Sequence, residues 1–221
     1  MAVEHAVLSS GSSNEAIHGL VDRVVRNGSH VHDTVHDTVV DVGCGTGSIA
    51  RTLLGSFRQY VGCDGVRYES FPHESWASFV QADLDKPPYP IADGTADLVL
   101  AIEVIEHLEN PRAFVRELVR MLKPGGRLVV TTPNQLSVLS KVSLVMRNQF
   151  HAFQEAPGLY PTHITALVEI DLRHIAQENR LTDVEVRYTD RGRIPFTGRH
   201  WPHGFRGRAF SDNVLLTGVK S

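Results

Sequence analysis

Residues 39–50 read Val-Val-Asp-Val-Gly-Cys-Gly-Thr-Gly-Ser-Ile-Ala, and this stretch decides the fold class. A β-branched run stops at a glycine-rich turn, and a segment with helical character follows. Alternating glycines after a strand let the backbone turn sharply and approach a ligand closely, while the next helix offers its amide N–H groups and the positive end of its dipole. The stretch therefore predicts a strand, a cofactor-binding turn and a helix.

Two cofactor classes fit this turn. Residues 45–50 also match the G-x-G-x-x-G/A pattern of dinucleotide-binding domains, so an NAD-dependent oxidoreductase is an alternative. Asp41 at the end of the strand favours the other class, because a carboxylate there would repel a pyrophosphate and attract a cationic ligand. S-adenosylmethionine (SAM) carries an ammonium and a sulfonium and has no phosphate.

Composition sets the broad class. The chain has 221 residues, a formal net charge of −3 and 42% hydrophobic residues, which is typical of a globular protein with a substantial core. The charge does not predict a general nucleic-acid-binding surface. No signal peptide is recognised and no apolar run approaches the roughly 18 residues of a membrane span, so we expect a cytoplasmic protein. Cys44 and Cys63 are expected to stay reduced.

Hydrophobic periodicity predicts alternating strands and helices over one domain, residues 1–221. This order predicts a doubly wound α/β fold whose sheet is mostly parallel. After it, two late strands are expected to form an antiparallel hairpin that finishes the sheet. Expected strands lie at 38–42, 59–63, 79–82, 96–102, 127–132, 183–188 and 213–219, and expected helices at 14–27, 49–56, 111–122 and 165–177, with a weak helix or turn at 69–77.

Acidic residues stand at the ends of three successive strands. Asp41 ends the first, Asp64 ends the second 23 residues later, and Asp83 follows the third. In such a sheet, ligands bind at the carboxyl ends of the strands. Asp64 could accept hydrogen bonds from two ribose hydroxyls, and Asp83 from an adenine amino group that Leu84 would cover. Together they favour an adenosyl ligand without phosphates.

The set of motifs resembles the class I SAM-dependent methyltransferases over about residues 38–134. Residues 41–47 resemble the family's first motif, 96–100 followed by 103–108 its fourth-strand motif, and 122–126 with 132–134 complete the set. The resemblance implies a seven-stranded sheet with an antiparallel last strand, SAM as cofactor and S-adenosylhomocysteine as product. It assigns cofactor binding to Asp41, Gly43, Cys44, Gly45, Gly47, Asp64, Gly65, Ala82, Asp83, Leu84 and Glu103.

Within the family, the Glu-His-Leu and Thr-Pro-Asn elements look most like the branch of ubiquinone-pathway O-methyltransferases. This branch implies a small-molecule or lipid-like acceptor, methylated at oxygen. His107 and His163 are the candidate catalytic residues. His107 could instead hold the turn after the fourth strand through a hydrogen bond to the backbone. His163 precedes the late helix and could either line the active site or have only a structural role.

A metal-dependent alternative uses the same region. Glu103, Glu106 and His107, with His163 or His151 as a fourth ligand, resemble the Glu-x-x-Glu-His site of small-RNA 2′-O-methyltransferases. Spacings of three and four residues would place these groups on one face of a helix. The other histidine-rich signature of that family is not found, and metal-free relatives share the pattern.

Two late segments are expected to shape the acceptor site. Residues 134–162 form an insertion that serves as a lid, or a helix that packs on the sheet edge. Residues 191–210 form a loop between the last two strands, in which five arginines alternate with aromatic residues; it binds a phosphate, a nucleic acid or an acidic headgroup, or is a plain surface loop. A SAM-binding regulatory protein without transferase activity is a third alternative. The sequence predicts neither the acceptor nor the oligomeric state.

Overall fold

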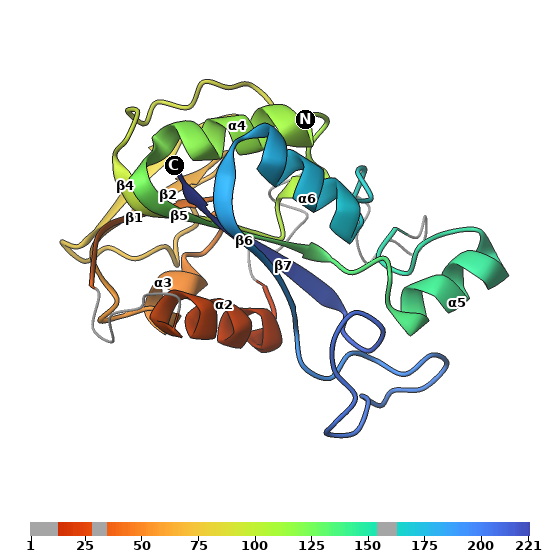
Figure 1. The fold of residues 1–221 in the computed structure, drawn as a ribbon. Coiled ribbons are helices and arrows are strands. Elements are labelled where there is room, and N and C mark those ends of the chain that lie inside the picture. Colours follow the sequence, from red (N-terminus) through yellow and green to blue (C-terminus); the bar gives the residue numbers. More distant parts are fainter. Residues whose placement is uncertain (1–12, 28–34, 154–162) are drawn as a thin grey trace.

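The computed structural model describes residues 13–27, 35–153 and 163–221, and its centre is a seven-stranded sheet (Figure 1). The strands are β1 (His36–Val42), β2 (Phe57–Asp64), β3 (Ala77–Gln81), β4 (Ala96–Ile102), β5 (Leu122–Pro133), β6 (Leu181–Tyr188) and β7 (Asn213–Lys220). The helices are α2 (Glu15–Asn27), α3 (Ser48–Thr52), the 3₁₀ turn η1 (Ile105–His107), α4 (Pro111–Met121), α5 (Val138–Arg147) and α6 (Glu169–Glu178).

The strand order is β3-β2-β1-β4-β5-β7-β6. Strands β1 to β5 pair in parallel, whereas β7 lies between β5 and β6 and runs antiparallel to both. This confirms the predicted doubly wound, mostly parallel sheet with an antiparallel last strand. The order reverses between β1 and β4, and a ligand crevice forms at such a switch point, outside the carboxyl ends of the strands.

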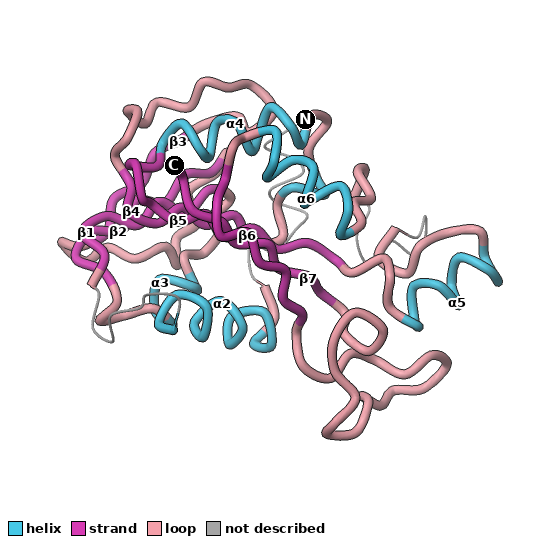
Figure 2. Tube along the Cα trace, viewed as in Figure 1, coloured by secondary structure: helices cyan, strands magenta, loops and turns pink. Residues whose placement is uncertain are grey.

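Helices cover both faces of the sheet (Figures 1 and 2). Helices α4 and α6 lie on one face and α2 and α3 on the other. Because successive side chains of a strand point to opposite faces, β1 contributes Val40 and Val42 to the core under α4 and α6, and Val39 to the core under α2 and α3. The side chains of β4 also point alternately into the two cores, so the sheet is buried on both faces.

Helix α4 shows why the predicted elements formed. Pro111 occupies its first turn, and the Asn110 side chain accepts a hydrogen bond from the Ala113 N–H at 2.9 Å, which caps the helix. Phe114 and Leu118 lie on the buried face, as the periodicity predicted. Within the described residues, no helix is long and apolar enough to cross a membrane.

Two predicted helix ends were wrong, and β5 starts at Leu122 rather than at 127. Helix α3 ends at Thr52 rather than at residue 56, before Gly55, which has a φ of +86°. The segment 69–77, expected to be a weak helix or a turn, forms turns and bends up to residue 76, and β3 begins at Ala77. Helix α6 begins at Glu169 rather than at 165, and the Asp171 carboxylate caps this start by accepting a hydrogen bond from the Val168 N–H at 3.1 Å.

Candidate functional site

The glycine turn after β1 adopts a backbone that other residues rarely take. Gly43, Gly45 and Gly47 have φ values of +78°, +48° and +68°. A Cβ atom at Gly43 would lie 2.2 Å from Cγ2 of Val104, and one at Gly47 would lie 2.5 Å from Cδ of Pro72. The turn is therefore packed closely on the start of η1 and on the segment after β2, which fixes its shape.

Asp64 holds this turn from the end of β2. Its carboxylate accepts a hydrogen bond from the Gly45 N–H at 2.8 Å and from the Gly65 N–H at 2.6 Å. Burial raises the pKa of Asp64, and these backbone donors oppose the rise. Each carboxylate oxygen can accept a second hydrogen bond, so the predicted contact with a ribose is compatible with this arrangement.

Asp41 is buried beside the turn, with only 2% of its surface exposed. Oδ2 accepts a hydrogen bond from the Tyr60 hydroxyl at 2.5 Å, while Oδ1 has no hydrogen-bond partner among the residues that the structure describes. Burial raises the pKa of Asp41 to about 7, with the Tyr60 hydrogen bond opposing it. A buried carboxylate oxygen without a partner suits a cationic ligand such as the ammonium of SAM.

Asp83 follows β3 and is connected to Asp64 through the backbone. The Ala82 N–H donates to the Asp64 carbonyl at 3.0 Å, and the Asp83 carboxylate pairs with Lys86 at 2.9 Å. The hydrogen bond from Lys86 lowers the pKa of Asp83, so this residue stays an acceptor. Asp83 and Leu84 are partly exposed, as contacts to an adenine would require.

The two cysteines lie inside the fold near these acids. Cys44 and Cys63 are both buried and free. Burial raises the pKa of both thiols, that of Cys63 to about 12, so neither is a reactive thiolate. Cys44 contributes to the site through its place in the turn.

Glu103 ends β4 in a left-handed conformation, with a φ of +56°. Its carboxylate accepts hydrogen bonds from the Thr131 hydroxyl at 3.1 Å and from the Asn213 amide at 2.9 Å. Burial raises its pKa to about 7, and these two donors oppose the rise. No local pattern points to Thr131 and Asn213, because strands β5 and β7 bring them to Glu103 only in the folded sheet.

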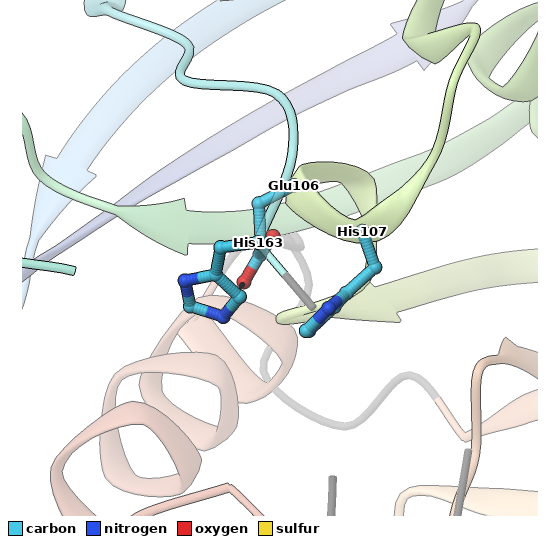
Figure 3. Close-up of side chains that lie close together, drawn as sticks. All are labelled: Glu106, His107 and His163. Atoms are coloured by element: carbon cyan, nitrogen blue, oxygen red, sulfur yellow. Dashed lines mark ion pairs between the residues drawn. The ribbon is translucent and has the colours of Figure 1, made fainter. Parts of the chain in front are cut away.

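Three other predicted side chains come together at η1 (Figure 3). Glu106 and His107 lie on η1, and His163 points toward them from the segment before α6. One oxygen or nitrogen from each of the three lies within 4.8 Å of the others, and Nε2 of His163 is 3.9 Å from Oε1 of Glu106. Glu103 is not part of this group, and the His151 N–H donates to Ser140 Oγ at 3.3 Å in the segment after β5.

The chemistry of this cluster follows from its burial. Within the described ranges, neither carboxylate oxygen of Glu106 has a hydrogen-bond partner, and burial together with the charge of Glu103 raises the pKa of Glu106. Burial, and then His107, lowers the pKa of His163 to about 4, so its ring is neutral. Nδ1 of His163 lies 2.9 Å from the Ala152 carbonyl, which assigns the proton to Nδ1 and leaves the Nε2 lone pair facing Glu106 and His107.

The sequence comparisons point to one family. Residues 40–130 match the family model described as a methyltransferase domain. The chain is 31% identical over 159 residues to a probable S-adenosylmethionine-dependent methyltransferase of Mycobacterium tuberculosis, covering 68% of this chain and 56% of that one. It is 39% identical over 107 residues to the tocopherol O-methyltransferase of Arabidopsis thaliana, covering 42% and 29%.

A third relative is the mitochondrial ubiquinone biosynthesis O-methyltransferase of Dictyostelium discoideum, 30% identical over 129 residues, covering 51% of this chain and 40% of that one. The chain thus spans between 29 and 56% of the length of these three relatives.

Solved structures share the fold. The N-methyltransferase NodS of Bradyrhizobium japonicum, in complex with S-adenosylhomocysteine, superposes with a TM-score of 0.60 at 17% identity and covers 92% of this chain and 85% of its own. A SAM-dependent methyltransferase of Archaeoglobus fulgidus gives 0.61 at 17% identity, covering 92% and 94%. The glycine turn, the acids at the ends of β1 and β2 and after β3, and the matching family model agree: the chain contains a class I SAM-dependent methyltransferase domain.

Proposed function

We propose that this chain transfers the methyl group of SAM to an oxygen atom of a small-molecule or lipid-like acceptor. The observation that carries the proposal is the buried Oδ1 of Asp41, which has no partner among the described residues and lies beside the glycine turn. That atom suits the ammonium of SAM and would repel the pyrophosphate of NAD. The relatives named tocopherol O-methyltransferase and ubiquinone biosynthesis O-methyltransferase support oxygen as the target atom.

In the proposed complex, each strand end has its own task. Asp41 accepts from the ammonium of the donor, Asp64 from the ribose hydroxyls, and Asp83 from the adenine amino group, with Leu84 against the ring. The backbone N–H groups that hold Asp64 on the turn keep its carboxylate in place before the ligand arrives.

Methyl transfer from a sulfonium is an in-line displacement in which the donor carries the driving force. The protein mainly aligns the acceptor oxygen and excludes water. A hydroxyl acceptor must also lose its proton, and the neutral His163 ring offers an unprotonated Nε2 for it. We propose His163 as the base and His107 as its neighbour, with ring centroids 4.5 Å apart.

A second candidate is metal-assisted transfer, and the specific observation is the cluster of Glu106, His107 and His163. One carboxylate and two imidazoles are a donor set that divalent transition metals accept, and the raised pKa of Glu106 is what an unpartnered buried carboxylate shows. A metal ion held there would supply Lewis-acid activation of the acceptor hydroxyl. The ribose 2′-hydroxyl of an RNA end is the corresponding acceptor.

The test begins with the cofactor. Calorimetry of the full chain with SAM, S-adenosylhomocysteine and NAD is expected to show binding of the first two and none of NAD. Transfer of a labelled methyl group is then measured on a panel of phenols, isoprenoid quinols in detergent, small amines and an RNA duplex. Methylation of a hydroxyl supports the proposal, whereas transfer to amines alone contradicts the choice of oxygen.

Two further outcomes separate the alternatives. Binding of SAM with no transfer to any acceptor would favour a regulatory protein, and a complete lack of SAM and S-adenosylhomocysteine binding would overturn the proposal. Methyl transfer to the RNA duplex, with no transfer to the phenols, would support the metal-assisted candidate.

A further inference from the structure

Two segments extend beyond the end of the sheet at which β5 ends and β7 begins (Figures 1 and 2). One is residues 134–153, which contain α5, and the other is residues 191–211, between β6 and β7. The Val138 N–H donates to the Ala209 carbonyl at 2.8 Å, and the Asn134 amide donates to the carbonyls of Arg208 and Ser211, both at 2.8 Å. The two segments therefore form one body, which we name the projecting unit.

The projecting unit is basic in a chain that is acidic overall. It contains no aspartate or glutamate, while the whole chain has a formal charge of −3. Some of its arginines pair with acids at its base, as Arg193 does with Asp212 at 2.7 Å. Lys141 and Arg199 are exposed and form no ion pair with any described residue. Its cations are Lys141, Arg147, Arg191, Arg193, Arg199, Arg206 and Arg208.

The same unit exposes large apolar side chains. Helix α5 buries Ser140 and Ser143 and turns Val145 and Met146 outward, with 86% and 66% of their surfaces exposed. This inverts the usual pattern of a surface helix, in which the apolar face packs on the core. Phe196 is 76% exposed in the loop. Five of the nine exposed large hydrophobic residues in the described chain belong to the projecting unit.

A ring cluster holds the loop part in shape. Trp201, Phe205 and Phe210 contact one another with centroids 5.0 to 5.6 Å apart, and Phe205 remains 43% exposed. The rings therefore pack this loop internally, while Phe196 and Arg199 remain exposed on it.

We infer that the projecting unit is a docking surface for an anionic lipid bilayer. The exposed aliphatic side chains can enter the acyl region of such a bilayer, and the lysine and arginine side chains beside them can contact its negative headgroups. A single-stranded nucleic acid matches the cations and aromatic rings, but it offers no apolar environment for Val145 and Met146. The positive charge and the exposed aliphatic side chains together favour lipid over nucleic acid as the ligand of this surface.

Hydrogen bonds connect the projecting unit to the candidate site. The Ala152 carbonyl accepts from His163, and Asn213, directly after the loop, donates to Glu103. Docking would therefore bring the candidate site close to the bilayer. Delivery of a lipid-like acceptor from the bilayer rests on the proposed function, whereas docking itself does not.

The experiment is co-sedimentation of the full chain with vesicles of phosphatidylcholine alone, or of phosphatidylcholine with phosphatidylglycerol. We expect binding to the anionic vesicles and none to the neutral ones. Lys141→Glu with Arg199→Glu is expected to weaken binding more than tenfold, since each cation near an anionic surface changes affinity about fivefold. Val145→Ser with Met146→Ser is expected to weaken it severalfold at unchanged charge.

Matched variants elsewhere on the surface control for general effects. Arg116→Glu on α4 changes an exposed charge, and Leu54→Ser changes a side chain that is 50% exposed. Both are expected to bind vesicles as the parent chain does, and all variants are expected to bind SAM with unchanged affinity, which separates docking from the cofactor site.

Three results would overturn the inference. The first is no sedimentation with anionic vesicles, and the second is an equal loss of vesicle binding in the Arg116→Glu control. The third is binding of a single-stranded RNA oligonucleotide that the charge variants abolish, with no binding of vesicles. Equal thermal unfolding temperatures among the variants verify that each one folds.

Discussion

Nε2 of His163 lies 3.9 Å from Oε1 of Glu106, although one residue precedes α6 and the other belongs to η1. The backbone makes this approach possible. The N–H groups of Ile164 and Thr165 both donate to the Glu106 carbonyl, and the Thr165 hydroxyl donates to the Leu108 carbonyl at 2.8 Å. Three hydrogen bonds therefore fix the histidine next to a buried carboxylate.

If the second candidate function holds, this relationship predicts metal binding. The full chain, dialysed against cobalt(II) or manganese(II) and then against buffer, is expected to retain about one ion per chain, because a carboxylate and two imidazoles converge. Glu106→Gln and His163→Ala are expected to retain little, whereas His174→Ala, which changes an exposed histidine of α6, is expected to behave as the parent. Elemental analysis and the visible spectrum of bound cobalt measure this. Retention by Glu106→Gln equal to that of the parent would refute the site.

Removal of the Asp41 charge is expected to weaken cofactor binding. Asp41→Asn keeps an oxygen to accept the Tyr60 hydrogen bond and loses the charge that we propose for the donor's ammonium. Charge-assisted hydrogen bonds contribute about 1.5 to 3 kcal/mol, so SAM affinity should fall about tenfold or more. Calorimetry at neutral pH measures the loss, and Asp97→Asn, on the amino-terminal side of β4, serves as the control. Unchanged SAM affinity in Asp41→Asn would exclude the assigned contact.

The raised pKa of Asp41 also predicts how stability depends on pH. An acid whose folded pKa is about 7 instead of 3.8 binds its proton more tightly when folded. Its contribution to stability is complete below its unfolded pKa and is lost as the pH rises through about 7, at an upper limit of about 4 kcal/mol. Relative to the parent, ligand-free Asp41→Asn should therefore gain stability on going from about pH 5.5 to about pH 8. Urea unfolding at both pH values tests the sign, and a relative loss would contradict it.

The contact between the glycine turn and η1 predicts an energetic coupling. Gly43→Ala places a Cβ against Val104 at a backbone φ of +78°, so we expect it to destabilise the fold by roughly 2 to 4 kcal/mol. Val104→Ala removes the clashing methyl groups and should recover part of that loss in the double variant. A double-mutant cycle by urea unfolding measures the coupling, and strict additivity of the two changes would show that the turn tolerates the Cβ without Val104.

The left-handed backbone of Glu103 predicts an unusual order of variants. Glycine accepts a φ of +56° without strain, so Glu103→Gly should be more stable than Glu103→Ala by about 1 kcal/mol. The same pair at Arg116, an exposed position inside α4, should give the reverse order by a similar amount. Denaturant unfolding compares the four variants. If alanine were the better residue at both positions, the backbone assignment of Glu103 would be wrong.

Local patterns predicted much of the fold and part of the site. The β-branched run and its glycines located β1 and the turn, and the alternating elements gave the sheet. The end of α3 and the start of α6 were missed, because the positive φ of Gly55 and the cap formed by Asp171 set them. For residues 134–162, the choice between a lid and a packed helix stays open, and residues 154–162 lie outside the described residues.

The local sequence was enough to place the acids that we assign to the methyl donor. Asp41 and Asp64 lie at the ends of β1 and β2, Asp83 follows β3, and parallel strands bring their carboxyl ends to one edge. The side-chain partners of the glutamates and histidines after β4 depend on the tertiary structure. The spacing of Glu103, Glu106 and His107 suggested a single face, yet the left-handed turn at Glu103 directs its carboxylate to Thr131 and Asn213, while distant backbone hydrogen bonds bring His163 to Glu106. Such pairings depend on contacts between remote segments, which no local periodicity encodes.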